Sequence, residues 1–87
     1  MEVDGMYAKH KTERLVAAIG SVTAAIGAQR ALLSAGVSAE VVSLLPDQTK
    51  KGCAYGVEFS ASEESAARGA LRRARIGVTQ YLRKDAE

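Results

Sequence analysis

An uninterrupted apolar run at residues 15–19, Leu-Val-Ala-Ala-Ile, constrains the fold more than any other feature of this chain. Apolar side chains at every position, rather than at every second one, are typical of a strand whose two faces are both covered. Gly20 and Ser21 follow the run at once, and both residue types interrupt regular structure. We therefore predict a central strand that leads directly into the next element.

A helix is predicted over residues 22–35. Ser21 is a good N-cap for it, and Gly36 suits the left-handed conformation that often closes a helix. One helical arc carries the large apolar residues of this segment, namely Val22, Ala25, Ile26, Leu32 and Leu33. We expect this arc to face the core. Gln29 falls within the arc, and we place it at the rim because a buried amide needs a partner.

Three further strands and one further helix follow. Pro46 stops the second strand, alternating apolar residues mark the third, and the spacing of Ser60 and Glu63 fits a capping box for the second helix. These segments are residues 39–45, 55–59, 60–75 and 78–82. The order strand, helix, strand, strand, helix, strand predicts a ferredoxin-like α+β fold. Its four-stranded antiparallel sheet has both helices on one face and the first and third strands at the centre.

Length and charge limit the classes of protein to consider. We expect the 87 residues to form one domain over residues 13–83, with a disordered leader at 1–12 and a charged tail at 84–87. The net charge of +2 is too balanced to indicate a nucleic-acid or membrane partner. One cysteine cannot form an internal disulfide, and no apolar run suggests a signal peptide or membrane span. We expect a cytoplasmic protein.

Cys53, the one cysteine, is the strongest candidate for a functional residue. It follows Lys50, Lys51 and Gly52 in a predicted loop, where nearby cations and exposure favour a reactive thiolate. The alternative is a buried cysteine that packs as a small hydrophobe. Both readings stay open from the sequence.

The predicted topology places this loop beside the start of the first helix. The first and second strands end at the same edge of the sheet, so Cys53 should lie near Gly20, Ser21 and Val22. Backbone N–H groups at a helix N-terminus stabilise an anion such as a thiolate. We therefore predict an anion-stabilising site formed by these three residues together with Lys50, Lys51 and Gly52.

A metal or catalytic site is not predicted. His10 is the one histidine and belongs to the leader, far from Cys53 in the predicted fold, so the two residues cannot supply the three or four ligands of a metal site. No general base accompanies Cys53. We expect neither a metal nor a cofactor, and no enzyme activity.

The segment Gly-Cys-Ala-Tyr-Gly-Val-Glu-Phe at residues 52–59 resembles the small selenium/sulfur carrier-like domains of bacteria, over residues 14–82. Ser21 at the helix start and Cys53 match the family pattern, whereas Ala54 stands where many members have glycine. The resemblance implies that Cys53 carries sulfur or selenium as a persulfide or selenenyl sulfide. It also implies partner proteins that donate and accept the chalcogen.

The sequence leaves two other functions open. The protein could be a homo-oligomeric interaction or small-ligand-binding module, in which the open sheet face pairs with a second copy through Val16, Ala18, Val42 and Leu44. The fold is also that of the RNA-recognition motif. RNA binding is disfavoured because Cys53 stands where that motif needs an aromatic ring, and the first strand has no aromatic residue at all.

Overall fold

The apolar run forms the middle of β1 (Glu13–Gly20), the strand on which the sheet is built. The computed structural model describes residues 13–44 and 54–85. In it, β1 pairs antiparallel with β3 (Tyr55–Ser60) on one side and with β4 (Gln80–Asp85) on the other. The edge strand β2 (Ala39–Ser43) pairs antiparallel with β3. The strand order β2-β3-β1-β4 places the first and third strands at the centre, as predicted.

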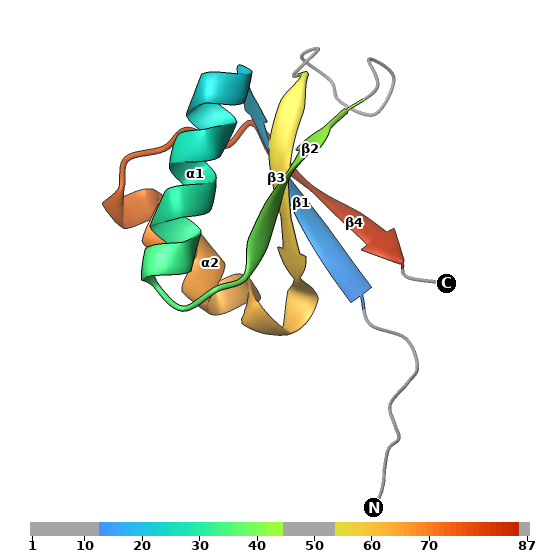
Figure 1. Cartoon of the computed structure of the whole chain (residues 1–87). Helices are drawn as coiled ribbons and strands as arrows, with labels where there is room; N and C mark the ends of the chain where they lie inside the picture. The colour runs from blue at the N-terminus through green and yellow to red at the C-terminus, as the bar shows by residue number, and fades with distance from the viewer. Residues whose placement is uncertain (1–12, 45–53, 86–87) are drawn as a thin grey trace, which may run out of the picture.

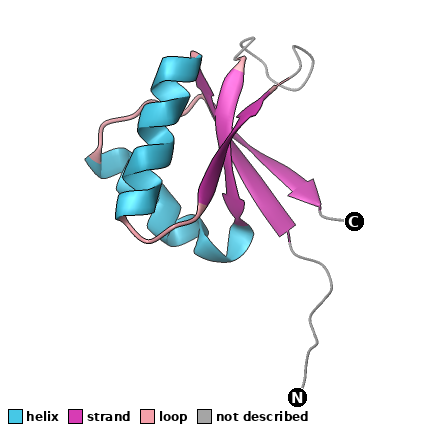
Figure 2. Ribbon diagram, in the orientation of Figure 1, coloured by secondary structure: helices cyan, strands magenta, loops and turns pink. Residues whose placement is uncertain are grey.

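Two helices, α1 (Val22–Ser34) and α2 (Glu64–Arg73), cover one face of this sheet, as Figures 1 and 2 show. The core lies between the two layers. Its largest fully buried side chains come from both layers and from the segment after α1, namely Phe59, Leu32, Leu71, Val37 and Val57. The element order and the single helical layer confirm the predicted ferredoxin-like α+β fold.

Several element boundaries differ from the predicted ones. β4 begins at Gln80, two residues later than expected, and it runs to Asp85. Lys84 and Asp85 were assigned to a charged tail, yet they pair with Arg14 and Glu13 of β1. Backbone pairing with residues 13–18 of β1 sets the length of β4, and charged residues in an edge strand do not prevent it.

The start of the second helix also differs from the prediction. A short 3₁₀ helix, η3 (Ala61–Glu63), precedes α2. The Ser60 hydroxyl accepts from the backbone N–H of Ser62 at 3.3 Å, and Glu63 makes no side-chain capping bond to α2. The Ser60–Glu63 capping box is therefore wrong, because the tighter 3₁₀ turn takes up the serine hydroxyl first.

β1 and β3 approach each other unusually closely near one end. Their register shifts between Ala18 and Gly20, and Gly56 of β3 lies opposite Ala18. A side chain at Gly56 would collide with the carbonyl oxygen of Ala17, and its Cβ would lie 3.2 Å from Val16 Cγ1. Glycine is therefore required at this position by the packing of the two central strands.

The buried side of α1 is not the arc that the sequence predicted. Ala25, Ala28 and Leu32 face the core, whereas Val22, Ile26 and Leu33 are exposed. Small side chains on the inner face let the helix pack closely on the sheet. Val22, Ile26 and Leu33 lie on the adjoining side of the same helix, so the prediction was wrong for these three of its five residues.

Gln29 lies on that adjoining side and makes a defined contact. Its Nε2 donates to the carbonyl oxygen of Ala39 in β2 at 2.9 Å, and the side chain is half-buried. The partly exposed position fits the rim that we expected, but the amide also has a protein partner. This bond ties α1 to the start of the edge strand.

The sheet face opposite the helices offers less apolar surface than the sequence suggested. Val16 and Ala18 point to this face, yet they are only 4% and 0% exposed. Val42 and Leu44 are half-buried. The four residues therefore do not form the exposed apolar patch that motivated pairing of this face with a second copy.

An ion cluster lies on the same face and spans three strands. Glu58 of β3 is 12% exposed and accepts from Arg14 Nε at 2.9 Å and from Lys84 Nζ at 3.2 Å. Burial raises the pKa of Glu58, but the two hydrogen bonds and positive charges outweigh burial and hold the pKa below its ordinary value. The two cations also offset the repulsion from Glu40, which lies directly opposite Glu58 in the ladder.

Replacing Gly56 tests the close approach of the central strands. We expect Gly56→Ala to lower the free energy of unfolding by about 2 kcal/mol or more, because β1 must shift to admit the methyl group. Gly27→Ala is the matched control, since a side chain there meets nothing within 4 Å and alanine favours the helix. Chemical denaturation of both variants measures the difference. Equal stabilities would contradict the proposed packing.

The ion cluster predicts a pH dependence of stability. Because the pKa of Glu58 is lowered in the folded state, its contribution is present above the unfolded pKa near 4.5 and is lost as the pH falls through the folded value. Glu58→Gln should cost about 1–2 kcal/mol at pH 7 and flatten this acid loss. Glu40→Gln, which removes a like charge, should cost nothing. Denaturation at several pH values would refute the cluster if the two variants behaved alike.

Candidate functional site

The start of α1 lies at one end of the sheet, where β1 and β2 end and β3 begins. Tyr55, the first residue of β3, pairs with Gly20 at the end of β1 and with Ser43 at the end of β2. Figure 1 shows the first turn of α1 and the beginning of β3 at this same end of the sheet. The start of β3 therefore lies beside the start of the first helix, and this arrangement is the one on which the prediction for Cys53 is based.

The turn from β1 into α1 depends on Gly20 and Ser21. Gly20 has φ +142°, a conformation that side chains rarely adopt, and it follows the register shift in β1. Ser21 is extended and caps α1, with its hydroxyl accepting from the N–H of Ala24 at 3.1 Å. The predicted N-cap is therefore correct, and it orients the first turn of α1 at the sheet edge.

The N-terminus of α1 is open to an anion in a way that α2 is not. α1 has no acidic residue in its first turn, whereas Glu64 occupies the first turn of α2. Within residues 13–44 and 54–85, the N–H groups of Val22 and Thr23 have no acceptor, as is usual for the first positions of a helix. The positive end of the helix dipole is therefore not neutralised by a side chain of the helix itself.

The predicted site residues divide into two groups. Gly20, Ser21 and Val22 lie together at this edge. Cys53, Lys50, Lys51 and Gly52 lie outside the described residues, so their roles remain predictions. The flanks of that segment are described: the N–H of Leu44 donates to the carbonyl oxygen of Ala54 at 2.7 Å, which extends the pairing of β2 and β3 by one residue. This bond fixes the position of Ala54, the covalent neighbour of Cys53, at the end of the sheet where β3 begins.

Two residues near this edge were not identified from the sequence. Thr79 donates to the carbonyl oxygen of Ala18 through its N–H at 2.9 Å and its hydroxyl at 3.3 Å. These two bonds hold the residue before β4 next to the register shift in β1. Tyr55 has the same parity as the buried Val57 and Phe59, so its half-buried ring lies on the helical side of the sheet. Tyr55 could have been found from its distance of two residues from Cys53, whereas no sequence pattern marks Thr79.

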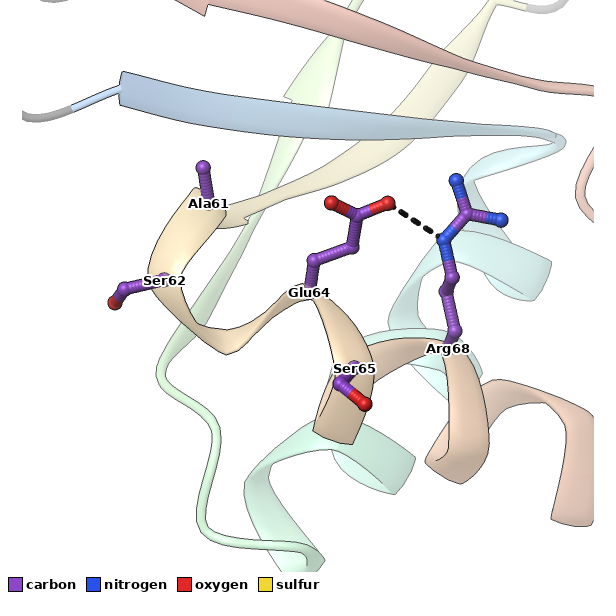
Figure 3. A pocket seen from close by; sticks show the side chains of 5 residues that line it. All are labelled: Ala61, Ser62, Glu64, Ser65 and Arg68. Carbon is purple, nitrogen blue, oxygen red and sulfur yellow. Dashed lines mark hydrogen bonds and ion pairs between the residues drawn. The ribbon is translucent and has the colours of Figure 1, made fainter.

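A hollow lies at the start of α2, as Figure 3 shows, and its two charged groups, Glu64 and Arg68, bind each other. Its lining residues are Ala61, Ser62, Glu64, Ser65 and Arg68. Arg68 Nε donates to Glu64 at 2.7 Å, and the Arg68 guanidinium lies 4.0 Å from the centre of the Tyr81 ring. Burial raises the pKa of Tyr81, against the opposing charge of Arg68. Arg68 is thus in contact with both an acid and an aromatic ring.

The described residues contain no grouping of three or more histidine, cysteine, aspartate or glutamate side chains that could hold a metal ion. Among the helices in the described part of the chain, none is both long and apolar enough to cross a membrane.

Comparison with known proteins identifies the family. The family model described as "Putative Se/S carrier protein-like" matches residues 14–83, which covers most of the chain and all but the first residue of β1 and the last two residues of β4. A search of curated proteins found no match. The match agrees with the resemblance noted around Cys53, and it includes the edge formed by Gly20, Ser21 and Tyr55. The chain therefore belongs to the Se/S carrier protein-like family.

Proposed function

We propose that this protein carries sulfur or selenium on Cys53 and passes it between a donor and an acceptor protein. Membership of the Se/S carrier-like family supports a carrier role. The observation that bears most directly on the site is the pairing of Tyr55 with Gly20, because it brings the strand that follows Cys53 to the start of α1. We infer a carrier rather than a catalyst.

The proposed transfer needs a thiolate and no cofactor. The Cys53 thiolate attacks the outer sulfur of a donor persulfide, the donor sulfur–sulfur bond breaks, and the donor leaves as a thiolate. Atoms and charge balance, because one thiolate replaces another and the transferred sulfur keeps its oxidation level. A selenium atom moves by the same exchange. Delivery to the acceptor repeats the step with Cys53 as the donor.

Stabilisation of the thiolate is assigned to the start of α1. The backbone at Gly20, Ser21 and Val22 presents the positive end of the helix dipole, and no acidic residue occupies the first turn. Lys50 and Lys51 would add positive charge, and Gly52 would give the backbone freedom to approach. A lowered thiol pKa raises the thiolate fraction at neutral pH, which speeds acceptance of the chalcogen. A cytoplasmic location fits this chemistry and is part of the proposal.

The thiol pKa can be measured from the rate of alkylation. The iodoacetamide rate of Cys53, plotted against pH, should have its midpoint below that of a free thiol at about 8.5. Thr23→Glu adds a carboxylate to the first turn of α1 and should raise this midpoint. Ser34→Glu adds the same charge at the far end of α1, about 16 Å along the axis and beyond the screening length, and should leave the midpoint unchanged. A wild-type midpoint at or above 8.5 would end the thiolate assignment.

The carried atom can be detected directly by mass. Protein purified without reductant should show an added sulfur or selenium atom that thiol treatment removes, and peptide mapping should locate it on Cys53. Cys53→Ser is the control and should show no added mass. A Cys53 that stays unmodified even after incubation with a small-molecule persulfide would contradict the carrier function, since accepting the atom is its first step.

A further inference from the structure

The large apolar side chains that remain exposed in the described part of the chain all lie on α1. Val22, Ile26 and Leu33 are 43%, 41% and 53% exposed. With Gln29 they follow one another at steps of four, three and four residues, which aligns them along one side of the helix. We call these four residues the α1 stripe. Alternating steps of four and three are the spacing at which two helices pack against each other in a coiled coil.

Charge is depleted around the α1 stripe. α1 contains no acidic residue, and its one basic residue, Arg30, lies beside the stripe rather than within it. The exposed side of α2 is different, since Glu64, Arg68, Arg72 and Arg73 belong to that helix. Depletion of charge around exposed apolar residues distinguishes the centre of a protein interface from ordinary surface. The α1 stripe therefore has the composition of an interface and α2 does not.

Gln29 is compatible with burial because its amide already has a partner. Its Nε2 donates to the Ala39 carbonyl at 2.9 Å, so covering the side chain leaves that donor bonded. The backbone N–H of Leu44 donates toward β3, and in an antiparallel pair every second residue bonds to the same neighbour, so Val42 and Glu40 also face β3. The Ala39 carbonyl therefore lies on the unpaired side of β2. Gln29, a member of the stripe, thus occupies part of the free edge of β2. Contact through the helix is favoured over addition of a strand to β2.

We propose that the α1 stripe packs against the same stripe of a second copy of this chain, with the two α1 helices antiparallel. The intervals between stripe residues are four, three and four, and they are the same when counted from either end of the helix. A twofold axis therefore pairs Val22 with Leu33 of the second copy and Ile26 with Gln29 of the second copy. Antiparallel helices also oppose their dipoles favourably. Arg30 stays at the rim, where water and salt screen its charge from the second copy.

The size of the stripe sets the strength of this dimer. A seam of three large apolar residues and one glutamine buries less than the roughly 800 Å² per partner of a standard stable interface. A dimer of this size dissociates on dilution. The second copy is therefore expected at high protein concentration rather than as a permanent subunit.

Sedimentation equilibrium tests the dimer on the full chain. The mean mass should rise with concentration from 9.2 kDa toward twice that value. Leu33→Lys should abolish the rise, because Leu33 is exposed and its replacement charges the seam. Ser34→Lys adds the same charge one residue along, on a different side of α1, and should behave as wild type. Circular dichroism verifies that both variants fold. A wild-type mass that stays at 9.2 kDa up to about 1 mM, or a Leu33→Lys variant that still associates, would overturn the proposal.

The antiparallel arrangement has its own test by disulfide cross-linking. In a Cys53→Ser background, Val22→Cys and Leu33→Cys together should form a covalent dimer under mild oxidation, because the twofold places these positions opposite each other. Each single cysteine variant should cross-link much more slowly, since its own counterpart lies at the far end of the helix pair. Rapid cross-linking of Leu33→Cys alone would show parallel helices and overturn the arrangement.

Discussion

The antiparallel pairing of β1 with β3 is the interaction on which the rest of the structure depends. It joins the two central strands, and every other strand pairs with one of them. Close contact at Gly56 and the register shift before Gly20 belong to this pairing, and together they bring the end of β1 to Tyr55. The start of α1 is fixed by where β1 ends. The position of the α1 N-terminus, where we propose the anion site, is therefore a consequence of strand register.

Much of the fold could be predicted from the sequence, because the strongest signals belonged to the most buried elements. The apolar run at residues 15–19 marked the central strand, and Ser21 and Gly36 marked the ends of α1. The inward face of α1 could not be read correctly. The alanines and several larger apolar residues lie on adjoining arcs of that helix. A prediction from side-chain hydrophobicity assigns the arc with the larger residues to the core. The residues that pack against the sheet are instead Ala25, Ala28 and Leu32, two of which are small.

The candidate site was predictable only where it follows from topology. Gly20, Ser21 and Val22 could be placed together because strand ends and helix starts share an edge in this fold. Thr79 could not be placed, since its two bonds to the Ala18 carbonyl depend on the path of the chain after α2. No periodic pattern in the sequence indicates that path. The ion cluster at Glu58 was equally hidden. Arg14, Glu58 and Lys84 are distant in sequence and meet only when three strands align.

The bond from Gln29 to Ala39 bears on how the protein avoids aggregation. β2 is a short edge strand with two adjacent valines, the kind of segment that recruits further strands in amyloid growth. A glutamine amide from the neighbouring helix binds the first outward carbonyl of that edge and takes the place that an incoming strand would need. A helix side chain thus occupies one outward acceptor at the start of β2, where an incoming strand would otherwise form a hydrogen bond.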